Sequence, residues 1–261
     1  MSLHGKSALV TGSTSGIGLA IAKALAACGC NLVITGFGDA AQIQALTESL
    51  AKQHAIQAAY IPADAARPAD IRSLIAASIQ RFGAIDILIN NVGIQHVAPL
   101  DEFPDEQWDR VIAVNLSAAF HATKAVLPSM KAKRWGRIIN VASAHGLVAS
   151  VGKAAYVAAK HGLVGLTKVV ALENAPFGIT ANAICPGWVR TPLVDQQVQA
   201  RAAHSGRTLA EEEKLLLGEK QPLQAFTTPE QIAALAIFLC GDSAATITGA
   251  SLPIDGGWVA H

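Results

Sequence analysis

The chain has no excess of charge of either sign, because its 261 residues include 20 lysines and arginines and 19 acidic residues, for a formal net charge of +1. Such a balance provides no general attraction to nucleic acid or to an anionic membrane. No uninterrupted apolar run reaches about 18 residues, so the sequence predicts neither a signal peptide nor a membrane span, and we expect a cytoplasmic location. The expected partner is a small molecule or another copy of the chain.

Cysteine is also scarce. The four cysteines lie inside apolar segments, at Cys28, Cys30, Cys185 and Cys240. Cys28 and Cys30 are separated by one residue, and no two cysteines have the spacing of a zinc-binding pair. We therefore expect four buried thiols in a reducing cytosol, and no metal site.

Linkers and low-complexity segments are absent too, so we expect a single domain over residues 1–261. Short apolar strands are predicted at 7–10, 31–35, 58–62, 85–90, 136–141, 179–185 and 251–254. Helical periodicity lies between them, including one long segment from about Asp105 through Asn115 towards Met130. Alternating strands and helices predict an α/β fold with a parallel sheet covered on both faces.

A glycine-rich turn follows the first predicted strand. It reads TGSTSGIG from Thr11 to Gly18 and precedes a helical segment that ends at Gly29. Glycines let a backbone approach a pyrophosphate, and the start of a helix offers unpaired N–H groups and the positive end of its dipole. The G-x-x-x-G-x-G spacing indicates a dinucleotide-binding loop, although glycine-rich turns also serve plain packing of a helix on a strand.

Basic residues are missing from the whole stretch between Cys30 and Ala51. A dinucleotide fold often carries an acid after its second strand for the adenosine ribose, whereas an arginine there accommodates a 2′-phosphate. This chain has Gly36 and Phe37 at that point. The lack of a cation favours NAD over NADP. Phe37 is either a residue that packs near the adenine or a surface aromatic at a strand end.

The stretch from Asn140 to Lys160 combines a hydroxyl, a phenol and an amine. Tyr156 and Lys160 are four residues apart and share a face of the predicted helix, while Ser143 follows the preceding strand. A nearby ammonium favours phenolate and is expected to lower the tyrosine pKa by roughly 1–3 units. A serine can donate a hydrogen bond to a forming alkoxide. The set predicts interconversion of an alcohol and a ketone, although the Tyr–Lys spacing alone is typical of an amphipathic helix.

Residues 191–223 depart from the alternation of strands and helices. The segment is polar, charged and helical, and it contains Glu211, Glu212, Glu213 and Lys214 in succession. One interpretation is a small helical lid over a substrate. The other is a solvated surface helix, which the acidic run fits better.

Taken together, these motifs resemble the short-chain dehydrogenase/reductase family over essentially the whole chain. The matching elements are TGSTSGIG at 11–18, NNVG at 90–93, Asn115, Ser143, YVAAK at 156–160, and Pro186 with Gly187. Six elements in this order are far more specific than any one of them. The resemblance implies a single-domain Rossmann fold, with a doubly wound seven-stranded parallel sheet, NAD as the cofactor and a homotetrameric assembly.

The resemblance also implies roles for individual residues. The catalytic set is Asn115, Ser143, Tyr156 and Lys160, with Tyr156 as general acid and base, Lys160 on the nicotinamide ribose and Asn115 positioning a proton-relaying water. The implied cofactor-binding residues are Gly12, Thr14, Ser15, Gly16, Ile17, Gly18, Phe37, Asp64, Asn91, Gly93, Tyr156, Lys160, Pro186, Gly187 and Val189. Val92 stands where the family motif usually has alanine and adds bulk beside the cofactor.

Several segments resemble the branch of this family that oxidises D-3-hydroxybutyrate, namely GIQHVAP at 93–99, SAHGLVAS at 143–150, ICPGWVRTPLV at 184–194 and DGGW at 255–258. This similarity implies a substrate site in which Gln95, His145, Lys153 and Gln197 hold a carboxylate and Trp188 and Trp258 wall the methyl end. A charge-assisted cage suits a small hydroxy acid that offers little surface. Taken alone, His145 fits a hydrogen-bonded loop histidine and Lys153 a solvated lysine.

The expected activity is reversible hydride transfer between C3 of 3-hydroxybutyrate and NAD, which gives acetoacetate. A reductase of 3-oxoacyl thioesters or of polyols is the nearest alternative, and its substrates lack the free carboxylate. A protein that binds NAD without catalysis is a further alternative, because a fold alone never fixes a function. The intact set of Asn115, Ser143, Tyr156 and Lys160 argues against it.

Overall fold

Seven short apolar strands form one parallel sheet in the computed structural model, which describes residues 2–260. The strands lie in the order β3-β2-β1-β4-β5-β6-β7, and every neighbouring pair is parallel. Their bounds are β1 Ser7–Val10, β2 Asn31–Ile34, β3 Ala58–Tyr60, β4 Ile87–Asn90, β5 Gly136–Val141, β6 Ile179–Pro186 and β7 Ser251–Ile254. The predicted seven-stranded sheet is therefore confirmed, with strand ends that differ by one or two residues.

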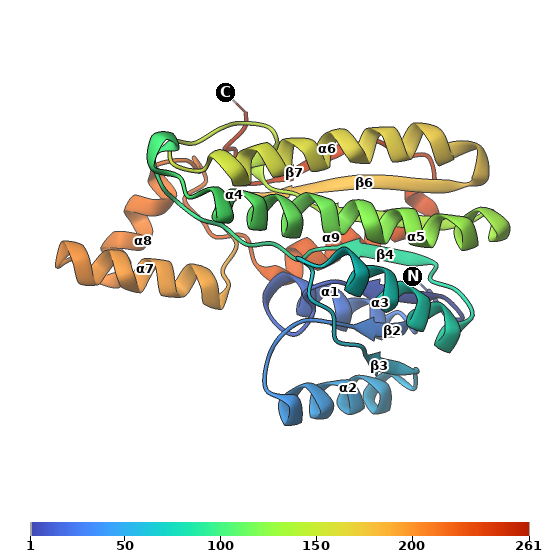
Figure 1. Cartoon of the computed structure of the whole chain (residues 1–261). Helices are drawn as coiled ribbons and strands as arrows, with labels where there is room; N and C mark the ends of the chain where they lie inside the picture. The colour runs from blue at the N-terminus through green and yellow to red at the C-terminus, as the bar shows by residue number, and fades with distance from the viewer. Residues whose placement is uncertain (1, 261) are drawn as a thin grey trace.

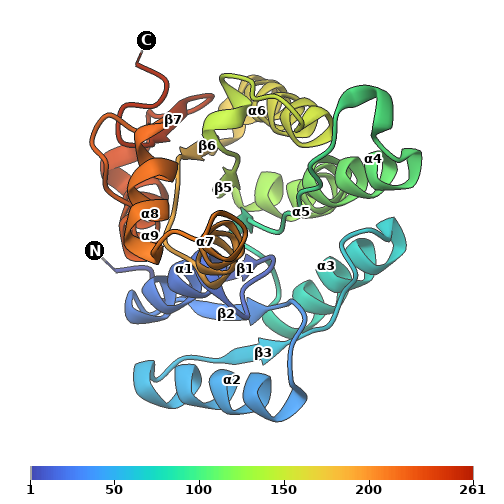
Figure 2. The same ribbon diagram turned by 90° about the vertical axis from the view of Figure 1, so that its left-hand side faces the viewer.

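Helices cover both faces of the sheet, as Figures 1 and 2 show. Their bounds are α1 Gly16–Ala27, α2 Ala40–His54, α3 Pro68–Phe82, α4 Asp105–Ile112, α5 Ala118–Lys133, α6 Ala154–Asn174, α7 Pro192–Ser205, α8 Leu209–Gly218 and α9 Pro229–Cys240. One layer contains α1 and α9, with α2 at its edge, and the other contains α3, α5 and α6. Helices α7 and α8 lie outside both layers and project at the left of Figure 1.

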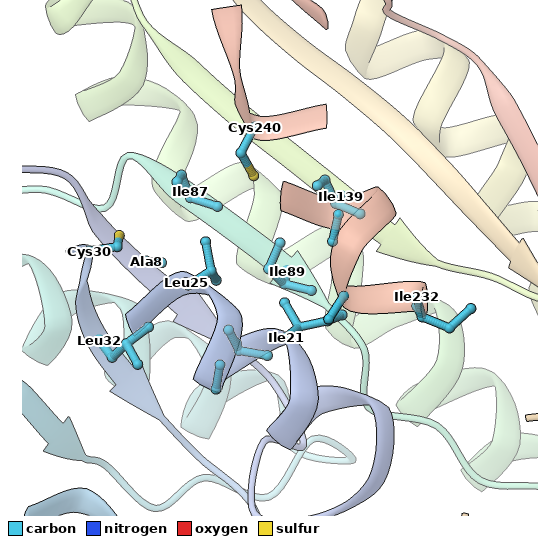
Figure 3. Packing of buried hydrophobic residues seen from close by; sticks show 14 of the residues in the cluster. Ala8, Ile21, Leu25, Cys30, Leu32, Ile87, Ile89, Ile139, Ile232 and Cys240 are labelled. Atoms are coloured by element: carbon cyan, nitrogen blue, oxygen red, sulfur yellow. The ribbon is translucent and has the colours of Figure 1, made fainter. Parts of the chain in front are cut away.

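The period of two in a strand divides the core between the two layers. In β1, Ala8 and Val10 face the α1 and α9 layer, while Leu9 between them faces the other layer. Figure 3 shows side chains of α1, β4 and α9 meeting on the first side, including Ile21, Ile89 and Ile232. Strands buried on both sides explain why their sequence is continuously apolar rather than alternating.

Two helical stretches are long and apolar enough to cross a membrane, Asp105–Lys133 and Ala154–Phe177. Both stretches contain helices of the layer formed by α3, α5 and α6, which packs on one face of the sheet. Val126 of α5 and Val170 of α6, for example, are buried in the same apolar cluster as Leu88 of β4. Their hydropathy is therefore explained by core packing.

The structure differs from the sequence prediction at several points. The long predicted helix is divided into α4 and α5 by a π-helical turn at Ala113–Ser117. Cys28 is only half-buried, whereas Cys30, Cys185 and Cys240 are buried as expected. The segment 191–223 forms two helices, with Gly206 ending α7 in the left-handed region at φ +73°.

The acidic run in that segment was expected to be a solvated face, and for Glu212 this is wrong. Its side chain is 2% exposed and pairs with Arg201 and Arg207 at 3.1 Å each, while Ser205 donates to it at 2.6 Å. These hydrogen bonds, that of Ser205 first, hold the pKa of Glu212 at about 2. Because Arg201 and Ser205 belong to α7, the carboxylate fastens α8 to α7.

Candidate active site

The loops at the carboxyl ends of the central strands enclose two adjoining cavities. This end of the sheet, where the strand order reverses between β1 and β4, is where open parallel sheets bind ligands. One cavity has a volume of about 220 Å³ and the other about 400 Å³. Ile17, Asn91, Gly93 and Thr191 line both of them, so the two spaces are continuous.

The smaller cavity brings together most of the predicted catalytic and substrate residues. It is lined by Gln95, Ser143, His145, Lys153, Tyr156, Lys160, Trp188, Gln197 and Trp258, together with the predicted cofactor residues Pro186, Gly187 and Val189. These residues come from five separate parts of the chain. The sequence prediction therefore named most of a site that only the fold assembles.

Ser143 and Tyr156 meet where β5 passes into α6. The Ser143 side chain forms a hydrogen bond with Tyr156, and Ser143 Oγ also accepts the backbone N–H of His145 at 3.1 Å. Burial raises the pKa of Tyr156, and the bond to Ser143 offsets this only in part. The tyrosine pKa is thus raised overall, because desolvation of the phenolate outweighs the hydrogen bond with Ser143. The expectation of a lowered tyrosine pKa is therefore wrong.

Lys160 lies one helical turn after Tyr156. Its Nζ donates a hydrogen bond to the carbonyl of Val141 at 2.9 Å and lies 5.5 Å from the centroid of the Tyr156 ring. Burial lowers the pKa of Lys160 to about 8. The amine therefore still carries a charge at neutral pH, inside a site that excludes most water.

Asn115 sits in the π-helical turn and lies behind Gly93 rather than on the wall of the larger or the smaller cavity. Its Nδ2 donates to the carbonyls of Ile94 and Val111, at 2.9 Å each, and its Oδ1 is buried without a hydrogen-bond partner among the described residues. A Cβ on Gly93 would lie 2.7 Å from that Oδ1 and 3.6 Å from Lys160 Nζ. The two polar atoms therefore face the same point.

The far end of the smaller cavity is aromatic. The Trp188 and Trp258 ring centroids are 5.9 Å apart, and His145 packs edge-on against Trp258 at 5.0 Å. Lys153 Nζ lies 5.4 Å from the centroid of the Trp188 ring. The Lys153 amine thus lies beside apolar walls. This arrangement favours the binding of a small anion that has an apolar end.

Burial shifts the pKa values of two ionisable side chains at this end of the cavity, His145 and Lys153. Burial first, then the positive charges of Lys153 and Lys220, lower the pKa of His145 to about 4, so the imidazole is neutral near pH 7. Burial also lowers the pKa of Lys153, while the carboxylate of Glu219 opposes that shift. A neutral imidazole and the Lys153 amine therefore line this end of the cavity.

The larger cavity is lined by the glycine-rich turn and by the ends of β2 and β4. Gly12, Thr14, Ser15, Gly16, Ile17, Phe37, Asn91 and Gly93 all contribute, as does Val92. Gly12 has φ +63°, and a Cβ on Gly18 would lie 2.2 Å from the carbonyl oxygen of Gly12. These glycines let the start of α1 approach the turn, so the cavity fits the pyrophosphate of a dinucleotide.

Side chains from distant parts of the chain fix this cavity. Asn91 Nδ2 donates to the carbonyls of Thr11 and Gly12, at 2.9 and 3.1 Å, and the Asn91 N–H donates to Thr11 Oγ1 at 2.9 Å. Thr14 Oγ1 donates to the Phe37 carbonyl at 2.8 Å. The loops after β1, β2 and β4 therefore form one wall.

Two predicted cofactor residues do not line either large cavity. Gly18 lies behind the turn, where it serves close packing. The carboxylate of Asp64 accepts the N–H of Ala66 at 2.9 Å and so shapes its own loop, while its neighbours Ala63 and Ala65 line the cavity.

The residues at the site that sequence reasoning did not name include Thr191 and Ser150. Thr191 lines both cavities and caps α7, and its place directly before Pro192 is a signal of a helix start that could have revealed it. Ser150 bonds the ring of His145, and nothing in the sequence pattern indicates that contact.

Comparisons with known proteins agree with this geometry. A family model described as enoyl-(acyl carrier protein) reductase matches residues 12–259. The chain is 56% identical to a D-beta-hydroxybutyrate dehydrogenase of Cupriavidus necator over 99% of this chain and 100% of that protein, and 52% identical to one of Rhizobium meliloti over 98% and 99%.

A solved structure gives the same result for the fold. A crystal structure of a variant of actinorhodin polyketide ketoreductase with NADPH superposes with a TM-score of 0.90, at 34% identity and with 98% of each chain covered. A glycine-rich turn beside β1, a Ser–Tyr–Lys set and this match over nearly the whole length lead to one conclusion: the chain belongs to the short-chain dehydrogenase/reductase family of oxidoreductases.

Proposed function

We propose that the chain is a cytoplasmic, NAD-dependent dehydrogenase that interconverts D-3-hydroxybutyrate and acetoacetate. The observation that carries the proposal is that one cavity of about 220 Å³ is lined by Ser143 and Tyr156 and also by Lys153, Gln95 and Gln197. In a 3-hydroxy acid, one carbon separates the carbinol from the carboxylate, so both groups must be bound within one small space. The similarity to the two D-beta-hydroxybutyrate dehydrogenases supports this substrate.

The proposed chemistry begins with a proton. Tyr156 accepts the proton of the 3-hydroxyl during oxidation and returns it during reduction, while Ser143 donates a hydrogen bond to the same oxygen. The nicotinamide cofactor supplies the hydride acceptor when it is bound. Lys160 holds its positive charge near the phenol, and its Nζ and the Asn115 Oδ1 face one point beside Gly93 where a proton can be passed on.

Substrate orientation is the second task of the site. Lys153 binds the carboxylate, and Gln95 and Gln197 donate amide hydrogen bonds to it. Trp188 and Trp258 stand at the apolar end, where they exclude water from the reacting carbon. Gln197 belongs to α7, so the α7–α8 pair acts as the lid that completes the site.

NAD is the proposed cofactor because the residues lining the larger cavity include no charged side chain. A 2′-phosphate would require a cation near Gly36 and Phe37, at the end of β2. Phe37 is 75% exposed there, with room to cover an adenine ring. Tyr156 and Lys160 would hold the nicotinamide ribose, and the turn from Gly12 to Ile17 would hold the pyrophosphate.

The deciding experiment follows NADH absorbance with D-3-hydroxybutyrate, beside its L enantiomer, its methyl ester and a parallel NADP series. We expect rapid oxidation of the D acid with NAD alone. Equal turnover of the methyl ester would remove the carboxylate from recognition and favour the alternative of a 3-oxoacyl thioester or polyol reductase. Activity with NADP alone would overturn the cofactor assignment.

We also propose that the chain forms a homotetramer. Apolar side chains remain exposed on the outer faces of α4, α5 and α6, notably Trp108, Phe120 and Leu172. Leu172 is 80% exposed, on the face of α6 that points away from the sheet. Size-exclusion chromatography with light scattering tests this: Leu172→Glu should weaken the assembly, whereas Val151→Glu in a loop should not.

A further inference from the structure

Gln221 is a fully buried polar side chain that lines neither of the two adjoining cavities. It begins the turn at residues 221–225, just after α8, and its N–H donates to the Leu217 carbonyl of that helix at 2.7 Å. Burying an amide costs free energy unless both of its ends have hydrogen-bond partners. The partners of Gln221 therefore show which segments the side chain holds together.

Backbone groups engage both ends of the Gln221 amide. Its Oε1 accepts the N–H of Trp188, and its Nε2 donates to the Ala225 carbonyl at 2.8 Å. A backbone N–H only donates and a carbonyl only accepts, so these two partners fix which end of the amide is oxygen and which is nitrogen. The side chain thus ties the loop after β6, which carries Trp188, to the turn 221–225.

The same turn also holds the loop after β7. The Leu223 N–H donates to the Gly256 carbonyl at 3.0 Å, and a Cβ on Gly256 would lie 3.0 Å from Gln221 Nε2. Gly256 takes φ +62° in this close contact and lies two residues before Trp258. The turn 221–225 is therefore attached to the backbone of both segments that carry the cavity's tryptophans.

The two tryptophan rings close the apolar end of the smaller cavity. Their centroids are 5.9 Å apart and their planes are inclined by 33°, so the rings pack on each other. Trp258 is 6% exposed, and the Asp255 carboxylate fixes its loop by accepting the N–H groups of Gly257 and Val259 at 3.0 and 2.9 Å. The space left for the apolar end of a substrate is thus set by where the Trp188 ring stands against Trp258.

We propose that Gln221 is a positioning residue that determines which 3-hydroxy acids the site accepts. By holding the Trp188 backbone against the turn that also holds the Trp258 loop, it keeps the two rings together and limits the apolar end to a methyl group. Longer acids bind poorly because their extra methylenes have to separate the rings. The proposal rests on the proposed function, since it concerns the apolar end of the same substrate.

The unaltered chain provides the first test. We expect kcat/KM for D-3-hydroxybutyrate to exceed that for D-3-hydroxyhexanoate by at least about tenfold, the lower limit of the discrimination that one methylene gives in an apolar pocket. Initial rates with NAD over a range of each acid measure both values. Equal kcat/KM for the two acids would overturn the proposal, because Gln221 would have no selectivity to determine.

A change at Gln221 provides the second test. Gln221→Met keeps the length of the side chain but removes both hydrogen bonds, and it should lower the ratio of the two kcat/KM values about tenfold. A merely structural role would lower both values together and leave their ratio unaltered. Gln224→Met makes the same exchange at an exposed side chain of this turn and should not change the ratio.

Gln221→Glu keeps the shape of the side chain and an acceptor for the Trp188 N–H, but its carboxylate has no proton to donate to the Ala225 carbonyl. It should lower the ratio as well, and it replaces Gln221→Met if urea unfolding shows that the methionine variant does not fold. An unaltered ratio in a folded variant at Gln221 would refute the proposal.

Near-ultraviolet circular dichroism tests the placement of the rings without any turnover, because aromatic side chains give this signal when their packing is fixed. Gln221→Met should change the tryptophan bands, and Gln224→Met should not. Unchanged bands in Gln221→Met would contradict the proposal. If the chain is inactive on D-3-hydroxybutyrate but Gln221→Met changes these bands, the proposed substrate is wrong while the hold of Gln221 on the tryptophans stands.

Discussion

Lys160 donates a hydrogen bond from Nζ to the backbone carbonyl of Val141 across 2.9 Å. The side chain is 3% exposed, so the bond fastens the second turn of α6 to the end of β5 in a dry environment. A carbonyl does not neutralise an ammonium, and burial therefore lowers the pKa of Lys160 to about 8 from 10.5. The Lys160 amine is held in place at a cost in stability.

That cost depends on pH in a defined direction. Above pH 10.5 the amine is neutral in the folded and the unfolded chain, so its burial does not lower the free energy of unfolding. As the pH falls from 10.5 towards 8, the unfolded chain binds a proton that the folded chain does not, and the folded chain is destabilised. Below pH 8 the amine is protonated in both states and the destabilisation is complete. Lys160→Met should thus raise the free energy of unfolding at pH 7 by on the order of 2 kcal/mol, after allowance for the lost hydrogen bond. Urea unfolding should show this gain shrinking between pH 7 and pH 10. A gain independent of pH, or an equal one in exposed Lys168→Met, would contradict it.

Tyr156→Phe removes the proposed acid and base while keeping the ring. We expect kcat to fall by about 10²–10⁴, the contribution of general acid–base catalysis, with NAD binding retained. Quenching of tryptophan fluorescence by NAD measures that binding. Tyr60→Phe is the matched control. Tyr60 donates to the carbonyl of Gly36 at 2.8 Å, and Gly36 lines the larger cavity. This variant should therefore change the KM for NAD and leave kcat unaltered. Near-normal turnover in Tyr156→Phe would remove this residue from the mechanism.

Lys153→Ala removes the cation at the proposed carboxylate site. A charge-assisted hydrogen bond contributes about 1.5–3 kcal/mol, so the KM for D-3-hydroxybutyrate should rise roughly 10- to 100-fold while kcat changes little. Initial rates over a range of hydroxy acid concentrations measure both constants. Lys168→Ala, at an exposed lysine of α6, should leave them unaltered. An unchanged KM would show that the carboxylate is bound elsewhere.

Phe37→Arg places a cation at the end of β2, beside the larger cavity. Because Phe37 is 75% exposed, the exchange should not disturb the core. An arginine can pair with a 2′-phosphate, and we expect kcat/KM for NADP to rise about tenfold relative to NAD. Phe37→Gln, of similar polarity without the charge, is the control. Equal effects of the two variants would mean that charge at this position does not select the cofactor.

Glu212→Gln should loosen the α7–α8 pair, since it replaces a carboxylate that Arg201, Arg207 and Ser205 hold together. Two charge-assisted bonds become weaker ones, so the pair should open more often. Limited trypsin digestion should then cut at Arg201 or Arg207 several times faster, and the KM for the hydroxy acid should rise because Gln197 is carried on α7. Exposed Glu106→Gln should do neither. Unaltered digestion would mean that apolar contacts alone hold the pair.

The sequence was sufficient to predict the sheet and to name most of the residues that line the candidate site. Apolar runs of strand length alternating with helical periodicity specify the seven strands, because such strands are buried on both faces. The Ser143, Tyr156 and Lys160 set could be found because two of its members share one helix face. Gln95 and Gln197, in contrast, could be assigned only through family resemblance, since a glutamine carries no local signal of its contacts.

What the sequence could not predict depends on contacts between distant segments. The π-helical turn at Ala113–Ser117 is invisible to helical periodicity, yet it accompanies Asn115 bonding across to Ile94. The acidic run around Glu212 predicts a solvated face, because the three partners of Glu212 lie elsewhere in the sequence. Arg201 and Ser205 belong to α7, and Arg207 belongs to the loop after it. Asp64 remains a prediction as a cofactor residue, since its carboxylate accepts the N–H of Ala66 in its own loop while its neighbours Ala63 and Ala65 line the larger cavity.

The bond from Asn91 to Thr11 joins residues 80 positions apart. The nucleotide-binding wall is thus a product of long-range assembly, formed only when β4 has paired with β1. A chain still emerging from the ribosome with its glycine-rich turn complete has no such wall, however well the turn itself is shaped. Affinity for the dinucleotide is therefore a late event in folding, and its appearance during synthesis would mark the moment at which the two halves of the sheet join.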